Sequence, residues 1–495
     1  MRVCVLCYHV EDSEQPLAAD DIPYDPTVYL DGHEADLVYL TKKTAVPQLI
    51  ALAREGYDVF LNLCDGAWDA DQPGIEVVQA LERLDLPFTG ADSRFYEPSR
   101  EAMKRVARAW GIAAPASVMV RRLDDVVRAE TLRFPLIVKH PNSYSSIGLT
   151  RDSRVETAEA LREQVERMME TYGGALVEEF VEGREFTVLV AENPDDAEQP
   201  TAYVPIEFSF PEGETFKHYH LKWVDYHGMH ARPCADDALA ERLKEAARRV
   251  FVGLGGVSYG RCDFRVDAAG EVYLLEINPN CAIFYPPSDP GSADLILQHD
   301  EAGHRGFVAQ ILAAALARHR RGHEPWEVRE RPGGDYGTFA TEPIAEGKTV
   351  QHYEEQPHVL VTRSHVERHW DERRKDWFAR YAWPLTDEVW VMWSDDPEEW
   401  RPVNHSCDPT AWLDGLDVVA RRPIAAGEEV TLDYATFYGE TMPDFPCTCG
   451  AANCRSTVRG ADHLGPFLVP YGPHVSDYVH TRRAEREGTG ASPRR

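Results

Sequence analysis

Residues 260–278 read GRCDFRVDAAGEVYLLEIN, and this stretch decides much of the fold. Two strand-like runs, 260–266 and 272–277, flank the turn residues 267–270. Apolar and β-favouring residues on both sides of a short turn containing Gly are typical of a β-hairpin. The stretch therefore predicts two paired antiparallel strands.

The predicted hairpin carries polar residues at a spacing of two. Because side chains alternate along a strand, Arg261 and Asp263 share one face of the first strand, and Glu276 and Asn278 share one face of the second. The turn can bring Asp263 near Glu276. Three oxygen ligands and an arginine on one face suit Mg²⁺ and phosphate. The alternative is a solvated hairpin face with incidental charges.

The rest of the chain divides on composition. The first 90 residues alternate strand and helix patterns, which predicts a parallel α/β unit. Residues 319–334 are charged and contain Pro and Gly, so we place a domain boundary there. Short strands, Trp and turn residues dominate from 335 onward. We expect an α/β domain at 1–95, an α+β domain at 96–322, a mostly-β domain at 328–445, a cysteine-rich loop at 446–470 and a disordered tail at 481–495.

Charge and cysteine content limit the function classes. The net charge of −31 repels phosphates, so we expect no nucleic-acid partner; basic peptides or amines would be attracted, unless the charge serves solubility only. We find no signal peptide and no apolar run long enough for a membrane span, so we expect a cytoplasmic protein without a membrane partner. In a reducing compartment, clustered cysteines indicate metal ligands. Cys4 and Cys7 have redox spacing, but a buried strand is the favoured interpretation.

Several motifs before residue 320 occur in the order of one enzyme family. They are Phe134-Pro135…Lys139, Ser145-Ser146-x-Gly148, Glu178-x-Phe180-x-x-Gly183-x-Glu185, Tyr219-x-x-Lys222-Trp223, Arg261-x-Asp263-Phe264 and Glu276-Ile277-Asn278-Pro279. Residues 1–320 resemble the ATP-grasp ligases of the D-alanine–D-alanine ligase type. The resemblance implies an ATP-grasp fold and ATP-dependent joining of a carboxylate to an amine through an acyl phosphate.

The resemblance also implies residue roles. ATP would be bound through phosphate, adenine and ribose contacts by Lys104 or Arg100, Lys139, Ser145, Ser146, Glu178, Phe180, Val181 and Glu185. Lys222 would cover the γ-phosphate and Arg261 would meet the acyl phosphate. Mg²⁺ would bind Asp263, Glu276 and Asn278. Departures from the family occur at Tyr144, 64–68 and 280–284, where amino-acid substrates would lie.

Four cysteines in the last third of the chain have the spacing of a metal site. Cys447-x-Cys449-x4-Cys454 supplies three thiolates, and Cys407 is a natural fourth ligand. A closed structural Zn²⁺ site takes four ligands. The alternative is a loop with unpaired surface thiols.

The same region carries a second set of motifs. Arg401-Pro402-Val403-Asn404-His405-Ser406-Cys407 precedes Gly427-Glu428-Glu429-Val430-Thr431-Leu432-Asp433-Tyr434. Residues 328–470 resemble the SET-domain lysine methyltransferases with a post-SET zinc loop. The resemblance implies that Asn404, His405 and the nearby Arg401 hold S-adenosylmethionine, and that Tyr434 positions the acceptor amine. Departures at Asp335, Pro402 and 353–356 fall on the cofactor rim and substrate strand.

These patterns predict a bifunctional enzyme with a ligase half and an N-methyltransferase half. Its substrates would be small molecules or peptides with carboxylate and amine groups, or a protein lysine as the methyl acceptor. The alternatives are a protein-lysine methyltransferase whose ATP-grasp half only binds or senses a ligand, and a ligase with a non-catalytic SET module. The ligand-binding alternative is disfavoured because the chain retains Lys139, Asp263, Glu276 and Asn278. The alternative of a non-catalytic SET module is disfavoured because the chain retains Asn404, His405 and Tyr434. The acid, the amine and the oligomeric state are not specified by these motifs.

Overall fold

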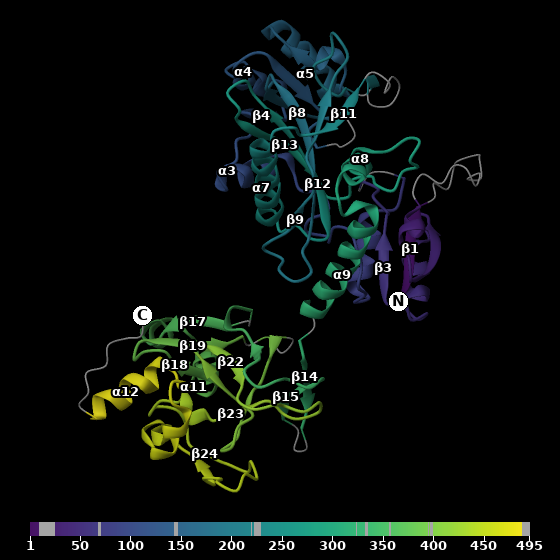
Figure 1. The fold of residues 1–495 in the computed structure, drawn as a ribbon. Coiled ribbons are helices and arrows are strands. Elements are labelled where there is room, and N and C mark those ends of the chain that lie inside the picture. Colours follow the sequence, from purple (N-terminus) through teal and green to yellow (C-terminus); the bar gives the residue numbers. More distant parts are fainter. Residues whose placement is uncertain are drawn as a thin grey trace. The chain divides into compact units, whose positions relative to one another are not determined.

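A computed structural model describes residues 1–8, 25–67, 71–142, 147–218, 220–221, 229–322, 324–331, 335–355, 358–394, 396 and 399–487. The chain forms two compact units, Met1–Gly322 and His323–Arg495, and each is described by itself (Figure 1). Among the described helices, none combines the length and apolar content needed to cross a membrane.

The chain begins with a three-stranded parallel sheet in the order β2-β1-β3. Cys4 and Leu6 of β1 face one hydrophobic core while Val3, Val5 and Cys7 face another, so the strand is buried on both sides. Such burial is usual for parallel strands and agrees with the buried-strand interpretation of the two cysteines. The elements are β1 (Arg2–Tyr8), η1 (Pro26–Tyr29), β2 (Glu34–Leu40), α1 (Ala45–Leu52), β3 (Val59–Asn62) and α2 (Ile75–Arg83).

A four-stranded antiparallel sheet in the order β4-β7-β5-β6 follows. Helix α5 covers it through Leu161, Val165 and Met168, which recur at helical spacing and are fully buried. The elements are α3 (Arg100–Ala109), β4 (Ser117–Val120), η2 (Leu123–Asp125), α4 (Val126–Ala129), β5 (Leu136–Lys139), η3 (Arg151–Ser153), β6 (Arg154–Val155), α5 (Ala158–Tyr172) and β7 (Ala175–Glu179).

The largest sheet of the first unit runs β11-β10-β8-β12-β13, with β9 paired to β8. Helix α7 packs on one face of β8 and β12, and helices α8 and α9 pack on the other (Figure 1). The elements are β8 (Arg184–Ala191), β9 (Thr201–Ala202), β10 (Ile206–Ser209), β11 (His230–Pro233), α7 (Asp237–Gly253), β12 (Tyr259–Val266), β13 (Val272–Asn278), α8 (Ser292–His299) and α9 (Gly303–Gly322).

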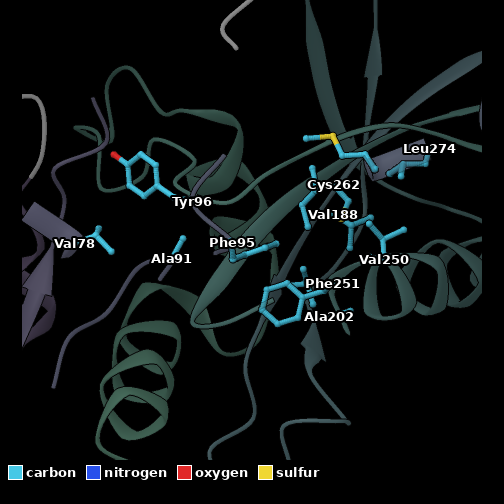
Figure 2. Packing of buried hydrophobic residues seen from close by; sticks show 14 of the residues in the cluster. Val78, Ala91, Phe95, Tyr96, Val188, Ala202, Val250, Phe251, Cys262 and Leu274 are labelled. Carbon is cyan, nitrogen blue, oxygen red and sulfur yellow. The ribbon is translucent and has the colours of Figure 1, made fainter. Parts of the chain in front are cut away.

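One hydrophobic core joins the early part of the first unit to the large sheet. Figure 2 shows Val78, Phe95 and Tyr96 in the same buried cluster as Val188 and Phe251. This core has members on both sides of the expected boundary near residue 95. Residues on both sides of this position belong to one compact unit. A separate domain that ends at residue 95 therefore stays a prediction.

The second unit is built from small sheets. Antiparallel sheets form in the orders β14-β15, β16-β22-β21, β17-β19-β18 and β24-β25, and β20 pairs with β23 in parallel. The strands are β14 (Trp326–Glu330), β15 (Tyr336–Ala340), β16 (Thr349–Gln351), β17 (His358–Thr362), β18 (Ala382–Pro384), β19 (Val389–Trp393), β20 (Asn404–His405), β21 (Ala411–Asp414), β22 (Asp417–Ala420), β23 (Thr431–Leu432), β24 (Phe445–Pro446) and β25 (Thr457–Val458).

Helices of the second unit lie between these strands and after them. They are η5 (Tyr353–Glu355), α10 (Arg363–His369), α11 (Glu372–Tyr381), η7 (Tyr434–Thr436), η8 (Gly460–Leu464), η9 (Pro466–Tyr471) and α12 (Asp477–Glu487). Helix α12 differs from the disordered tail expected at 481–495, because residues 481–487 are helical. Val479 of this helix is fully buried against Leu468 and Tyr471, and this packing overrides the polar composition of the segment. Residues 488–495 lie outside the described part.

Candidate active sites

The hairpin of β12 and β13 brings the predicted magnesium ligands together. The strand register pairs Asp263 with Glu276 and Arg261 with Asn278, so the proximity expected from alternation is confirmed. The amide nitrogen of Asn278 lies 3.4 Å from an oxygen of Asp263 and 3.3 Å from an oxygen of Glu276. Three oxygen-bearing side chains therefore meet at one place.

Arginines balance the two carboxylates of this group. Arg261 donates to Asp263 at 3.0 and 3.2 Å, and Arg100 of helix α3 pairs with Glu276. Burial opposes the charged form of Asp263, but Arg261, Lys217 and the hydroxyl of Thr187 together outweigh burial and lower the pKa of Asp263 to about 2. Burial and the repulsion from Asp263 raise the pKa of Glu276, but Arg100 and Lys139 together outweigh them, so this pKa is also lowered. Both carboxylates are thus ionised at neutral pH, as Mg²⁺ ligands must be.

Glu178 of β7 lies between two lysines from other elements. Its carboxylate is 2.5 Å from the ammonium nitrogen of Lys104 and 2.7 Å from that of Lys139. Glu178 is 1% exposed; burial opposes its charge, yet the two ammonium groups hold its pKa well below the usual range. Burial lowers the pKa of Lys104. The two lysines expected to hold phosphate are thereby fixed on one carboxylate.

An open cleft of about 800 Å³ lies over these groups. Its lining includes the predicted residues Lys139, Glu178, Phe180, Val181, Glu185, Arg261, Asp263 and Glu276. Ile137, Phe180 and Phe216 form a small buried apolar cluster at its wall, which suits a flat aromatic base. The cleft therefore offers both ionic groups and an apolar wall to a bound molecule.

The position directly before β8, residue 183, accepts only glycine. Gly183 has φ +140°, and a Cβ there would lie 2.1 Å from the carbonyl oxygen of Val266. The close approach of the two strands places Glu185 beside Arg265, at 2.9 Å. Arg265 also donates to the carbonyl oxygen of Val181 at 3.0 Å and lies over the ring of Phe180. The segment expected to face adenine is therefore held by Arg265.

Two basic residues of the cleft were missed by the motif reasoning. Arg265 continues the alternation of Arg261 and Asp263, so strand spacing could have found it. Lys217 lines the cleft 3.5 Å from Glu185, and its pKa is lowered by burial against the opposing influence of Glu185 and Asp263. It was not selected because the motif pointed to Lys222. Lys222, Ser145, Ser146 and Tyr144 lie outside the described residues.

A smaller cavity lies between parts of two segments that differ from the family motifs, 64–68 and 280–284. It is lined by Asn62, Leu63, Cys64, Asp65, Tyr259, Asn280, Cys281, Ala282 and Ile283. Burial raises the pKa of Asp65 to about 6. Residues 64–65 and 280–283 are far apart in sequence, yet they line a single cavity in the first unit.

Four cysteine sulfurs gather in the second unit. The Sγ atoms of Cys407, Cys447, Cys449 and Cys454 all lie within 4.8 Å of one another. All four are free thiols. Backbone N–H groups also point at the sulfurs, from Arg455 to Cys407 at 3.4 Å and from Ser456 to Cys454 at 3.4 Å. The donor set and its compactness fit a closed tetrahedral Zn²⁺ site.

Strand β20 presents Asn404 and His405 beside β23. The amide of Asn404 donates to the carbonyl oxygen of Tyr336 and to Glu429, both at 2.8 Å. The ring of His405 accepts from the backbone N–H of Tyr434 at 3.1 Å through Nδ1, and its Nε2 lies 3.3 Å from the sulfur of Cys407. Both side chains are thus engaged with other parts of the protein.

Tyr434 is separated from β23 by Asp433 alone and lies in an aromatic group with Phe437, Tyr438 and Phe445. Its hydroxyl donates to the carbonyl oxygen of Val403 at 3.1 Å. Burial raises its pKa, so the phenol stays protonated. Arg401 lies over the ring of Trp326. The structure therefore brings Asn404, His405 and Tyr434 together, with Arg401 set against Trp326.

Gly337 packs tightly against this group. A Cβ at this position would lie 2.5 Å from a carboxylate oxygen of Glu429 and 3.0 Å from the amide nitrogen of Asn404. A side chain at this position would displace the carboxylate of Glu429 and the amide of Asn404 from their present places. The close packing suits a site at which backbone groups approach a ligand.

Comparisons with known proteins agree with this architecture. The family model for the D-ala D-ala ligase C-terminus matches residues 106–283, and the SET domain model matches residues 335–435. The D-alanine–D-alanine ligase of Chromohalobacter salexigens is 33% identical over 239 residues, covering 47% of this chain and 69% of the relative. The enzyme of that name from Burkholderia pseudomallei is 30% identical over 282 residues, covering 54% of this chain and 83% of the relative.

A solved structure was also found. The D-alanine–D-alanine ligase from Bacillus anthracis complexed with ATP has 17% sequence identity and a TM-score of 0.49, covering 65% of this chain and 100% of that chain. From the sequence relatives and the two matched family models, the chain belongs to the D-alanine–D-alanine ligase family and joins that ATP-grasp ligase part to a SET-type methyltransferase domain.

Proposed function

We propose that the protein is a bifunctional enzyme that forms an amide bond with ATP and Mg²⁺ and transfers a methyl group from S-adenosylmethionine to a nitrogen. In the first reaction a substrate carboxylate attacks the γ-phosphorus of ATP, giving an acyl phosphate and ADP. An amine then attacks the acyl carbon, and phosphate leaves. In the second reaction an amine lone pair attacks the methyl carbon of S-adenosylmethionine, the carbon–sulfur bond breaks, and the neutral thioether S-adenosylhomocysteine leaves.

The observation that carries the ligase half is the meeting of Asp263, Glu276 and Asn278 beside arginines. Mg²⁺ bound there would neutralise phosphate charge. Phosphoryl transfer depends mostly on positioning and on charge neutralisation. Lys104 and Lys139 are proposed to hold phosphates, and Phe180 and Val181 to contact adenine, with Glu185 at the ribose. Lys222, Ser145 and Ser146 remain proposed ATP contacts on sequence alone.

Arg261 is proposed to meet the acyl phosphate. It lines the cleft, and it opposes the rise that burial causes in the pKa of the Cys281 thiol. The cavity lined by Asp65 and Asn280 is proposed to bind the acid or the amine. Its lining departs from the family motif, so the substrates need not be those of the relatives.

The methyltransferase half rests on Tyr434, Asn404 and His405. A protonated phenol hydroxyl beside the carbonyl oxygen of Val403 forms a polar end that can orient an amine. The acceptor must be uncharged to attack, so proton removal precedes transfer, and orientation then supplies much of the acceleration. Backbone groups of Asn404 and His405, with Arg401 nearby, are proposed to hold S-adenosylmethionine. Zn²⁺ on the four cysteines is proposed to hold the loop that closes this site.

One experiment tests both halves. The purified chain is incubated with ATP, Mg²⁺ and mixtures of amino acids, and separately with labelled S-adenosylmethionine and amine mixtures. We expect phosphate release with at least one mixture and labelled methylated product with at least one amine, identified by mass spectrometry. Absence of phosphate release with every mixture, together with methyl transfer to protein lysine, would support the alternative of a methyltransferase with a ligand-binding ATP-grasp half.

A further inference from the structure

A buried ion pair connects the cysteine loop to the segment that carries Tyr434. Arg455 directly follows Cys454, and Asp433 directly precedes Tyr434. The guanidinium of Arg455 donates to both carboxylate oxygens of Asp433, at 2.7 and 2.5 Å. The side chain of Asp433 is 1% exposed and that of Arg455 is 16% exposed. A two-point ionic contact of this kind fixes direction as well as distance.

The carboxylate of Asp433 also shapes the turn after it. It accepts from the backbone N–H of Ala435 at 3.1 Å and so caps the short helix η7, which begins at Tyr434. The hydroxyl of Tyr471 donates to the same carboxylate at 3.2 Å. Because the cap defines the start of η7, the direction of the Tyr434 side chain follows from the position of Asp433.

The position of Arg455, the other member of the ion pair, is determined by contacts at the cysteine site. The backbone N–H of Arg455 donates to the sulfur of Cys407 at 3.4 Å, and the guanidinium lies over the ring of Phe467. A second route leads to the same sulfur, since His405 contacts Cys407 through Nε2 and accepts from the N–H of Tyr434 through Nδ1. Contacts from both sides of Tyr434 therefore end at one metal-ligating thiol.

We propose that Arg455 and Asp433 form a positioning pair that holds Tyr434 in its working orientation and makes that orientation depend on metal occupancy of the four-cysteine site. Metal binding draws the four sulfurs together, which fixes the backbone at Cys454 and hence the place of the Arg455 guanidinium. Groups that orient metal ligands commonly change metal affinity or activity by roughly 10–100-fold when they are removed. The proposal rests on the proposed methyltransferase function for its catalytic meaning, but the coupling itself can be measured without a substrate.

The test uses the full chain loaded with zinc and labelled with 3-fluorotyrosine. The variants are Arg455→Met, Arg455→Lys and Asp433→Asn, and Tyr434→Phe assigns the fluorine resonance. Arg422→Met is the matched control, because Arg422 pairs with Glu428 at 2.6 Å on the surface of the same unit. Zinc release to a chromogenic chelator and the position of the Tyr434 resonance are recorded.

We expect Arg455→Met and Asp433→Asn to speed zinc release by about tenfold or more and to displace the Tyr434 resonance while zinc is bound. Arg455→Lys keeps the charge but loses the two-point contact. Its rate of zinc release and its Tyr434 resonance should therefore lie between those of the other two variants and those of the wild type. Removal of zinc from the wild type should displace the same resonance. A Tyr434 resonance unchanged in both Arg455→Lys and Asp433→Asn would overturn the proposal, as would zinc release no faster than in Arg422→Met.

A catalytic arm separates this inference from the proposed function. Methyl transfer to poly-L-lysine is measured for Arg455→Lys, Tyr434→Phe and the double variant. If Arg455 acts through Tyr434, the kcat loss from Arg455→Lys disappears in the Tyr434→Phe background while KM changes little. An additive loss would contradict the positioning role. A wild type that methylates no amine would remove the proposed function, whereas the fluorine and zinc measurements would still decide the coupling.

Discussion

The hydroxyl of Tyr434 donates a 3.1 Å hydrogen bond to the carbonyl oxygen of Val403, the residue before Asn404. The ring thereby joins the segment after β23 to β20, the two segments that carry the proposed methyl-transfer residues. This hydrogen bond can be removed without changing the shape of the ring.

We expect Tyr434→Phe to lower kcat for methyl transfer by about a hundredfold, because the amine loses the group that orients it. The free energy of unfolding should fall by only about 1 kcal/mol, the usual effect of one lost hydrogen bond. Tyr438→Phe is the control, since Tyr438 is buried in the same aromatic group. Labelled methyl transfer and thermal unfolding measure the two effects, and an unchanged kcat would remove the assigned role.

Glu276→Gln should lower ATP turnover by about a hundredfold or more, because a neutral amide replaces a charged metal ligand and leaves Arg100 without its carboxylate. Methyl transfer should stay at the wild-type rate, since Tyr434 belongs to the other unit. The exposed Glu271 of the same hairpin supplies the control variant Glu271→Gln. Phosphate release measures the effect, and turnover equal to that of the control would argue against a metal site here.

Glu178→Gln tests the buried charge between the two lysines. Removal of one partner from a buried ionic group costs about 3–5 kcal/mol, because the remaining charges stay desolvated. Glu179→Gln should cost about 0–1 kcal/mol, since the Arg133 partner of Glu179 is mostly exposed. Thermal unfolding of the first unit at neutral pH compares them, and equal losses would contradict the assigned burial.

The same carboxylate predicts a pH dependence. The folded pKa of Glu178 lies below its ordinary value of 4.5, so its charge stabilises the fold at pH above about 4.5. This contribution is lost as the pH falls from 4.5 toward the lowered folded pKa. The difference in stability between wild type and Glu178→Gln should therefore shrink on acidification over that range. A difference that stays constant down to pH 3 would mean that the pKa is not lowered.

The cysteine cluster predicts bound zinc. We expect one zinc per chain by elemental analysis and a reduced content in Cys454→Ser, while Cys234→Ser, whose thiol lies in the first unit, keeps the wild-type content. Chelation should move the unfolding transition of the second unit to lower temperature and leave that of the first unit in place, because metal binding energy contributes to folding. Equal zinc in both variants would exclude the cluster as the site.

Local patterns predicted the hairpin well and the side-chain partners poorly. Alternation placed Asp263 opposite Glu276, because a short turn leaves few registers. It did not predict that Arg100 pairs with Glu276 across 176 residues, since no local rule relates them. His405 shows the same limit: its motif predicted a place beside the methyl donor, while tertiary packing turned its ring toward Cys407 and Tyr434.

The sequence by itself determined the two families, the hairpin that carries Asp263 and Glu276, and the four cysteines of the proposed zinc site. The hairpin residues and Cys447, Cys449 and Cys454 stand at short spacing, which backbone geometry converts directly into proximity. Cys407, 40 residues before Cys447, was assigned because a structural Zn²⁺ site takes four ligands. Only the tertiary structure decided that Glu178 holds both lysines and that Arg455 holds Asp433. Those pairs unite separate elements, and they are set by how the hydrophobic cores bring the elements together. The hairpin thus supplies the proposed ligands Asp263 and Glu276 together with Arg261, which pairs with Asp263, while Arg100 of helix α3 pairs with Glu276.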